Sequence, residues 1–278
     1  MIHFSIKFIE GDWQVYRHAL LYLFNDKIIA MNFWVIIPAR YASTRLPGKP
    51  LCLIGKYPML WYVYQHALES GADKVIIATD DERIYQTAQN FGATVCMTSQ
   101  NHRSGTDRVA ETIQQWQANP DTVVVNVQGD EPLLPATLIR QTAEALIQNP
   151  HADVATLCEP IVTKEDIFNP NIVKVVYDAQ SFALYFSRAP IPWLRDEFAT
   201  PSFISKLHMR HIGIYAYRAA YLLYCTQLPI ATLEQAEALE QLRILVNGGK
   251  IYVAEASMSP GIGVDTPEDL EKIQQLLA

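Results

Sequence analysis

Short apolar runs rich in β-branched residues alternate with helical stretches through the first half of the sequence, and this alternation limits the fold more than any other feature. Short strands that alternate with helices of ten to fifteen residues are typical of a mostly parallel sheet with helices on both faces. In such α/β folds, ligands bind outside the carboxyl ends of the strands. The predicted strands are 33–38, 74–79, 94–97 and 122–127, and the helices predicted between them are 59–70, 82–91 and 106–116.

The second half of the sequence has a different pattern. We interpret 31–278 as one α/β domain with an inserted, partly antiparallel subregion at about 160–230. Residues 1–30 have no place in either pattern, and we predict that they are a dispensable extension. The elements predicted in the second half are a hairpin of 172–177 and 182–186, a strand at 211–217, a long helix at 233–246 and a strand at 250–254.

One loop of this acidic chain carries only cations. The stretch 27–68 contains no Asp or Glu, although the chain has 29 acidic residues and 22 Lys and Arg. Arg and Lys side chains bind phosphate oxygens well. We therefore predict that the loop binds a small polyanion, for which a nucleoside triphosphate fits best, although a solvated surface loop is the alternative. The loop matches neither a Walker nor a Rossmann motif, and its polar residues are Arg40, Ser43, Thr44, Arg45 and Lys49.

Composition excludes several other classes of protein. The net charge of −7 is unfavourable for a face that binds nucleic acid, which needs a basic stripe. No apolar run reaches the roughly 18 residues that a membrane span requires. The four cysteines have no metal-ligand spacing, so we expect reduced thiols in a cytoplasmic protein without a signal peptide.

Two acidic residues are candidate metal ligands. Asp130 follows the strand predicted at 122–127, and Asp265 precedes a helix start at Pro267. Mg²⁺ commonly takes one or two carboxylates, with water and phosphates completing its shell. The pair has this meaning only if the fold brings both to one cleft. The alternatives are a helix cap for Asp265 and a solvated turn acid for Asp130.

A second acidic pair follows the strand predicted at 74–79. Asp80 and Asp81 resemble a metal-binding pair. We interpret Asp81 instead as the cap of the next helix.

Six blocks of sequence carry a family resemblance. They are IIPARYASTRLPGKPL at 36–51, SGTDR at 104–108, VNVQGDEP at 125–132, RHIGIY at 210–215, LEQLR at 239–243 and GVDTPEDL at 263–270. In this order and spacing they resemble the 3-deoxy-manno-octulosonate cytidylyltransferases (CMP-Kdo synthetases), whose fold is of the nucleotide-diphospho-sugar transferase type.

The resemblance implies a reaction. A cytidylyl group would pass from CTP to 3-deoxy-manno-octulosonate, giving CMP-Kdo and pyrophosphate for lipopolysaccharide synthesis. It also implies Mg²⁺, a cytoplasmic location and a homodimer.

The resemblance also implies roles for individual residues. Arg40, Ser43, Lys49 and, more weakly, Arg45 would hold the CTP phosphates, and Arg40 and Lys49 would stabilise charge in the transition state. Asp130 and Asp265 would hold the metal. Ser104, Thr106 and Arg108 would face the nucleotide, although the two hydroxyls also read as a helix N-cap. The sugar acid would contact Gln128, Arg188, His211, Tyr215, Glu240 and Gln241.

The chemistry of the residues leaves alternatives open. A sialate cytidylyltransferase would need similar phosphate chemistry and would differ mainly in the acceptor pocket. A non-catalytic nucleotide-binding module could use the cationic loop without turnover, and a metal-dependent glycosyltransferase would release a nucleoside diphosphate. No residue stands out as a general base.

Overall fold

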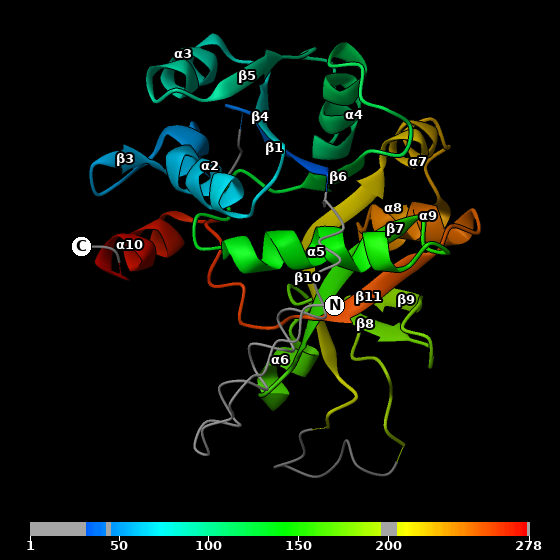
Figure 1. Cartoon of the computed structure of the whole chain (residues 1–278). Helices are drawn as coiled ribbons and strands as arrows, with labels where there is room; N and C mark the ends of the chain where they lie inside the picture. Colours follow the sequence, from blue (N-terminus) through cyan, green and yellow to red (C-terminus); the bar gives the residue numbers. More distant parts are fainter. Residues whose placement is uncertain (1–31, 43–45, 196–204, 277–278) are drawn as a thin grey trace, which may run out of the picture. The chain divides into compact units, whose positions relative to one another are not determined.

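Figure 1 shows a computed structural model of the chain, which describes residues 32–42, 46–195 and 205–276. These described residues belong to one compact unit. Residues 1–30, predicted to be dispensable, lie outside the described residues.

Nine strands form the main sheet of the described chain. Their order is β11-β7-β10-β6-β1-β4-β5, and β8 and β9 continue from β10. β1 pairs in parallel with β4 and β6, whereas β10 runs antiparallel between β6 and β7. The predicted α/β fold with a mostly parallel sheet is confirmed. The strands are β1 (Phe33–Ala39), β4 (Lys74–Thr79), β5 (Thr94–Met97), β6 (Val123–Asn126), β7 (Val154–Pro160), β8 (Lys174–Tyr177), β9 (Ala183–Ser187), β10 (Met209–Arg218) and β11 (Ile251–Glu255).

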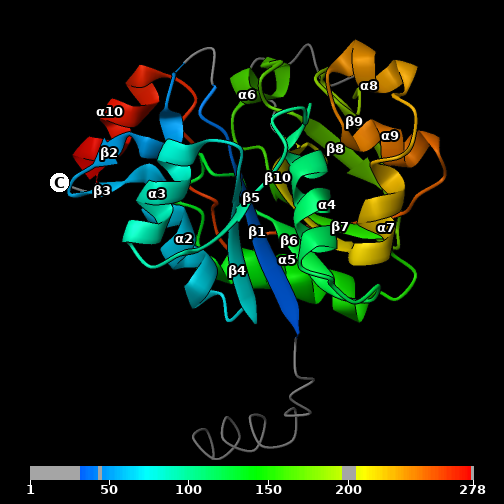
Figure 2. The same ribbon diagram turned by 90° about the horizontal axis from the view of Figure 1, so that it is seen from above.

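Helices cover the sheet on both sides. α2 packs against α5, and in Figure 2 β1 and β4 stand between α2 and α4. The helices are α2 (Met59–Glu69), α3 (Glu82–Asn90), α4 (Gly105–Gln115), α5 (Ala136–Gln148), α6 (Lys164–Phe168), α7 (Ala219–Cys225), α8 (Thr232–Glu237), α9 (Gln241–Val246) and α10 (Pro267–Leu276), with a 3₁₀ turn η1 (Lys49–Leu51) and a small hairpin of β2 (Leu53–Ile54) and β3 (Tyr57–Pro58).

The core is centred on β1. Val35, Ile36 and Ile37 have no exposed surface, because helices cover both faces of this strand. Burying side chains of this size stabilises a fold by about 1.5–3 kcal/mol each. β1 therefore fixes the start of the cationic loop, which leaves its carboxyl end at Arg40.

Side-chain caps set the starts of α3 and α4. The Asp81 carboxylate accepts a hydrogen bond from the Arg83 amide at 2.9 Å. The Ser104 hydroxyl accepts one from the Asp107 amide at 3.1 Å. Such caps contribute about 1 kcal/mol each. The predicted capping roles of Asp81 and Ser104 are confirmed.

The predicted hairpin between 172 and 186 is confirmed as β8 and β9, which pair antiparallel. The strand predicted at 211–217 is β10, and it lies near the middle of the main sheet. The main sheet therefore reaches into the 160–230 region, where an insertion was predicted.

The single long helix predicted at 233–246 is wrong. Two short helices, α8 and α9, replace it. Ala238 between them has a left-handed backbone, with φ 51° and ψ 49°. The chain then turns so that Leu239 is buried.

Contacts with β9 accompany this break. The Glu237 carboxylate accepts hydrogen bonds from the Ser187 hydroxyl at 2.6 Å and from the Arg188 amide at 3.0 Å. The Arg188 Nε donates in return to the Glu237 carbonyl at 2.7 Å. Together with the burial of Leu239, these tertiary contacts outweigh the helical propensity of the local sequence.

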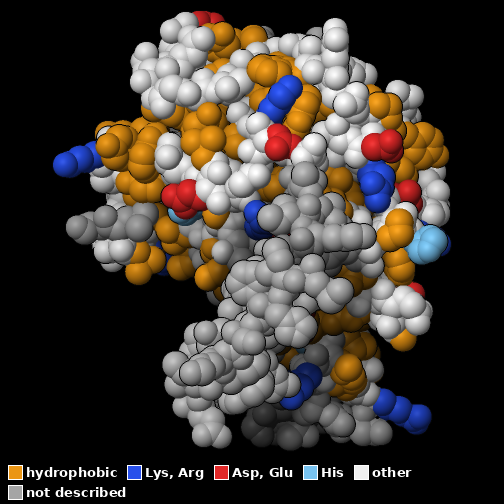
Figure 3. Space-filling view, viewed as in Figure 1, with side chains coloured by type: hydrophobic (Ala, Val, Ile, Leu, Met, Phe, Trp, Pro, Cys, Tyr) orange, Lys and Arg blue, Asp and Glu red, His pale blue; other side chains and the backbone are white. Residues whose placement is uncertain are grey.

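The surface carries no broad basic face where it can be viewed. In Figure 3 the described Lys and Arg side chains are scattered among acidic, hydrophobic and uncharged ones, without a continuous stripe. None of the helices in the described ranges is long and apolar enough to cross a membrane.

Replacement of Ala238 by Gly tests the strained corner. Glycine adopts a left-handed backbone without the steric cost that a Cβ imposes. We expect Ala238→Gly to raise the free energy of unfolding by about 0.5–1 kcal/mol in urea titrations. The control is Ala236→Gly inside α8, which should lower the free energy of unfolding by about 0.5–1 kcal/mol. An equal loss of unfolding free energy in both variants would show that the backbone at Ala238 carries no strain.

Candidate active site

Lys49 joins two aspartates that are far apart in the sequence. Its Nζ donates to Asp130 Oδ2 at 2.7 Å and to Asp265 Oδ1 at 3.2 Å. A third bond, to the Val264 carbonyl at 2.7 Å, is buried. The fold therefore meets the condition set for the two aspartates, which lie in one cleft beside the end of the cationic loop.

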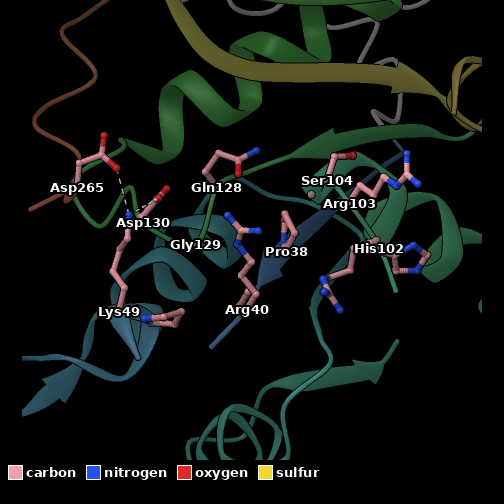
Figure 4. A pocket seen from close by; sticks show the side chains of 14 residues that line it. Pro38, Arg40, Lys49, His102, Arg103, Ser104, Gln128, Gly129, Asp130 and Asp265 are labelled. Carbon is pink, nitrogen blue, oxygen red and sulfur yellow. Dashed lines mark hydrogen bonds and ion pairs between the residues drawn. The ribbon is translucent and has the colours of Figure 1, made fainter. Parts of the chain in front are cut away.

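A cavity of about 250 Å³ surrounds this meeting point. In Figure 4, Lys49, Asp130 and Asp265 form one end, and His102, Arg103 and Ser104 form the other. Arg40 lies between the two ends. One end of the cavity therefore holds acidic and cationic side chains together, and the other end holds cationic ones. Its remaining lining residues are Pro38, Ala39, Pro50, Gly105, Arg108, Gln128 and Gly129.

Local backbone geometry places Lys49 at the cavity. Gly48 precedes it with φ 70°, a conformation that favours glycine. The Gly48 amide donates to the Tyr41 carbonyl at 3.0 Å, which closes the loop. Ser43 and Arg45, both predicted to bind phosphate, lie within this loop but outside the described residues.

Close packing also shapes the floor of the cavity. A Cβ on Gly129 would lie 3.1 Å from the Pro38 carbonyl oxygen. A Cβ on Gly105 would lie 3.2 Å from the Pro38 ring. The two turns that carry Asp130 and the start of α4 therefore approach β1 more closely than larger residues would allow.

The structure does not support the two alternative roles, a helix cap for Asp265 and a solvated turn acid for Asp130. Thr266 and Asp269 cap α10: the Thr266 hydroxyl accepts from the Asp269 amide at 3.3 Å, and Asp269 Oδ2 accepts from the Thr266 amide at 3.1 Å. Asp265 instead pairs with Lys49. Asp130 also pairs with Lys49 and is not simply a solvated turn acid.

The donor set at this point fits a divalent cation that also contacts phosphate. Asp130 and Asp265 supply carboxylate oxygens, and the Lys49 ammonium shows that a positive charge is stable between them. Within the described residues no group of three or more His, Cys, Asp or Glu could hold a metal alone. Substrate oxygens and water would complete the coordination.

The start of α4 meets the same cavity. Ser104 and Arg108 both line it, whereas Thr106 lines a neighbouring cavity. The Arg108 guanidinium is buried and donates to Asp80 Oδ2 at 2.8 Å. Asp80 therefore anchors Arg108.

A second cavity, of about 90 Å³, contains most of the residues predicted to bind the sugar acid. Gln128, which lines both cavities, joins Tyr215, Glu240 and Gln241 there. Burial raises the pKa of the Glu240 carboxyl and raises the pKa of Tyr215 well above its usual value. The Tyr215 hydroxyl is buried without a hydrogen-bond partner among the described residues. An unpaired buried hydroxyl suits a polar, hydroxyl-bearing ligand.

Alternate residues along one segment serve the two cavities. Asn126 lines the second cavity, Gln128 lines both, and Asp130 lines the first. Asn126 ends β6, and the Gln128 carbonyl accepts a hydrogen bond from the Glu131 amide at 3.3 Å, so Asp130 lies in the turn that follows the strand. The end of β6 and the turn after it therefore connect the two cavities.

His211 lies beside Tyr215, with ring centroids 5.3 Å apart, as expected for two residues on the same face of β10. Its imidazole also packs edge-on against Phe186. Burial lowers the pKa of His211 to about 3, so the ring is neutral at physiological pH.

Arg188 is not brought to either cavity. Its guanidinium donates to the carbonyls of Glu237, Pro170 and Ala238 at 2.7, 2.8 and 3.4 Å. In this structure Arg188 supports the corner between α8 and α9 and makes no contact at the cavities.

Two charged or titratable residues of the first cavity, and Glu131 next to Asp130, were not predicted from the sequence. His102 and Arg103 line it directly before Ser104, and His102 pairs with the Glu111 carboxylate. Burial, aided by the Asp130 charge, raises the pKa of Glu131 to about 7. The loop that carries His102 and Arg103 joins β5 to α4, so its place after a parallel strand could have indicated them.

Comparison with known proteins agrees with this geometry. A family model described as Cytidylyltransferase matches residues 34–251. A 3-deoxy-manno-octulosonate cytidylyltransferase of Nitrosococcus oceani is 55% identical over 251 residues, which is 89% of this chain and 97% of that protein. One of Vibrio parahaemolyticus is 53% identical over 250 residues, 89% of this chain and 99% of that protein.

Two solved structures are also similar. A CMP:2-keto-3-deoxy-manno-octonic acid synthetase complexed with CTP has a TM-score of 0.81 and 41% identity, covering 88% of this chain and 98% of its own. A cytidylyltransferase from Leptospira borgpetersenii, with a TM-score of 0.54 and 15% identity over 88% of this chain and 85% of its own, shares the fold.

The low pKa of His211 predicts a loss of stability in acid. The folded chain holds the ring neutral until about pH 3, whereas the unfolded chain takes up a proton near its usual pKa of 6.5. The stabilising contribution is therefore present above pH 6.5 and lost as the pH falls. Between about pH 7.5 and pH 5 the loss should be on the order of 2 kcal/mol.

Urea titrations at both pH values measure this loss. His211→Gln should reduce the pH dependence by that amount, while His151→Gln at an exposed position should not. The same pH dependence in wild type and His211→Gln would contradict the assignment.

Proposed function

The chain belongs to the 3-deoxy-manno-octulosonate cytidylyltransferase family, and we propose that it transfers a cytidylyl group from CTP to 3-deoxy-manno-octulosonate, releasing pyrophosphate. The observation that carries this proposal is the contact of Lys49 with both Asp130 and Asp265 in a cavity that Arg40 also lines. The product, CMP-Kdo, would serve lipopolysaccharide synthesis.

The residues of the first cavity act on the phosphates. The anomeric hydroxyl of the sugar acid attacks the α-phosphorus, the bond to the bridging oxygen of pyrophosphate breaks, and the hydroxyl proton is lost to water. Negative charge on the phosphate oxygens is stabilised by Lys49 and Arg40, because both cations line the same space. Ser104 and Arg108 orient the nucleotide from the opposite end.

Asp130 and Asp265 would hold Mg²⁺. A bound Mg²⁺ neutralises phosphate charge and polarises the reacting oxygens. With the metal as their counter-charge, the carboxylates would no longer need Lys49, and its ammonium would be available to the phosphates. Lys49 thus balances the two aspartates until substrate arrives.

The second cavity holds the sugar acid. Gln128 lies between the two cavities and would orient the acceptor toward the phosphate. Tyr215, Glu240 and Gln241 offer hydrogen bonds to sugar hydroxyls. Arg188 would meet the carboxylate only after releasing the three carbonyls that it now contacts.

Three broader proposals accompany the activity. The catalytic domain begins at Met31, so a chain shortened to start there should keep its activity. The protein is cytoplasmic, which its four free cysteines support.

The third proposal is that the protein is a homodimer whose contact uses the 160–230 region. The molar mass measured by light scattering would test it. In that region large apolar side chains are exposed, among them Val162, Leu184, Trp193 and Leu207.

Pyrophosphate formation tests the activity directly. We expect release from CTP only when 3-deoxy-manno-octulosonate and Mg²⁺ are both present, because charge neutralisation and the acceptor are each required. Other nucleoside triphosphates and sialate, assayed in parallel, should give much slower release. Turnover with sialate at the same rate would point to a different sugar acid, and CTP binding without release would point to a binding module.

Substitution of Asp130 tests the metal role. Asp130→Asn should lower kcat by at least about 10²-fold while the protein folds normally, because one carboxylate ligand is lost. Asp81→Asn is the matched control, since Asp81 follows β4, another parallel strand of the same sheet, and asparagine caps helices equally well. A near-normal rate in Asp130→Asn would remove Asp130 from the metal site.

A further inference from the structure

A break in the pairing of β10 surrounds one buried threonine. The register between β10 and β7 shifts between Ile212 and Tyr215, where Thr156 of β7 faces the irregular stretch. Thr156 has no exposed surface. Its hydroxyl oxygen lies 2.7 Å from the Ile214 carbonyl oxygen, 3.1 Å from the Ile212 carbonyl oxygen and 3.0 Å from His211 Nε2.

Proton counting fixes the direction of these bonds. A hydroxyl has one proton to donate and lone pairs to accept with, whereas a carbonyl oxygen only accepts. If the proton went to His211, both carbonyl oxygens would face lone pairs of the Thr156 oxygen. The proton therefore goes to the carbonyls, of which Ile214 is nearer, and His211 Nε2 must be the donor to Thr156.

The other ring nitrogen of His211 is then an acceptor. A neutral imidazole carries one N–H, so a proton on Nε2 leaves Nδ1 with a lone pair. No bond to Nδ1 occurs within the described residues. The ring lies against Tyr215, whose own hydroxyl is buried without a partner and which lines the second cavity.

We propose that Thr156 is a positioning residue that fixes His211 as the Nε2–H tautomer, so that Nδ1 accepts a hydrogen bond from a hydroxyl group of the sugar acid. This inference rests on the proposed function for the identity of the ligand. It assigns His211 to a neutral hydroxyl and not to the carboxylate, because a bare ring nitrogen repels an anion. Thr156 acts without touching the substrate.

The tautomer can be observed without any turnover. Long-range ¹H–¹⁵N correlation spectra of histidine-labelled protein distinguish protonated from bare ring nitrogens, and loss of one signal set in His211→Gln identifies His211 among the seven histidines. We expect Nε2 protonated and Nδ1 bare at neutral pH in the wild-type protein. A proton on Nδ1, or on both nitrogens, would overturn the proposal.

Two variants of Thr156 test its role. Thr156→Val removes the hydroxyl at nearly constant volume and should change or mix the tautomer, whereas Thr156→Ser should keep it. We expect Thr156→Val to raise KM for 3-deoxy-manno-octulosonate about three- to tenfold, the effect of one hydrogen bond, with KM for CTP unchanged. Thr156→Ser should restore the wild-type value.

The outcomes separate the positioning role from the proposed function. An unchanged tautomer in Thr156→Val, or equal rises in both KM values, would overturn the positioning role. If the wild type shows the expected tautomer but releases no pyrophosphate, the assignment of the tautomer holds and the proposed function fails.

Discussion

The site depends on one ion pair network that spans the chain. Lys49 lies in the 3₁₀ turn after the cationic loop, Asp130 follows β6, and Asp265 precedes α10. Without a cation between them, the two carboxylates would repel each other at close range. The ammonium thus allows the end of the chain to pack beside the middle of the sheet. The stabilising contribution is moderate, because both aspartates remain partly exposed.

Charge is divided between two neighbouring spaces. The first cavity collects formal charges, including Arg40, Lys49 and the aspartates. The second contains Tyr215 and the Glu240 carboxyl, whose neutral forms burial favours, with the neutral ring of His211 beside them. Arg243, which also lines it, is paired with Glu234. A triphosphate with a metal suits the first environment, and an array of hydroxyls suits the second. Gln128, which is uncharged, stands where they meet.

The hydrophobic pattern of the sequence was sufficient to predict strands of the sheet that supports the site. Strands at 74–79 and 94–97 were predicted with the limits of β4 and β5, because buried parallel strands are short continuous apolar runs. That Asp130 and Asp265 must share one cleft was stated from the sequence as a condition, and the contacts of both with Lys49 meet it. The break at Ala238 and the position of Arg188 were not predictable, because contacts between β9 and α8 determine both. Those contacts link residues about fifty positions apart and leave no local pattern.

The spacing of Asn126, Gln128 and Asp130 along the end of β6 and the turn after it makes this short segment intolerant of changes in length. β6 holds Asn126 in register with β1 and β10, and a turn closed by the Glu131 amide and the Gln128 carbonyl at 3.3 Å follows at once. One residue more or less would therefore move Gln128 or Asp130 away from its cavity. Both cavities and the lysine contact would be lost together, although the composition of the segment would hardly change. Evolution can therefore vary the chemistry of these positions one at a time, but not the number of residues that separates them.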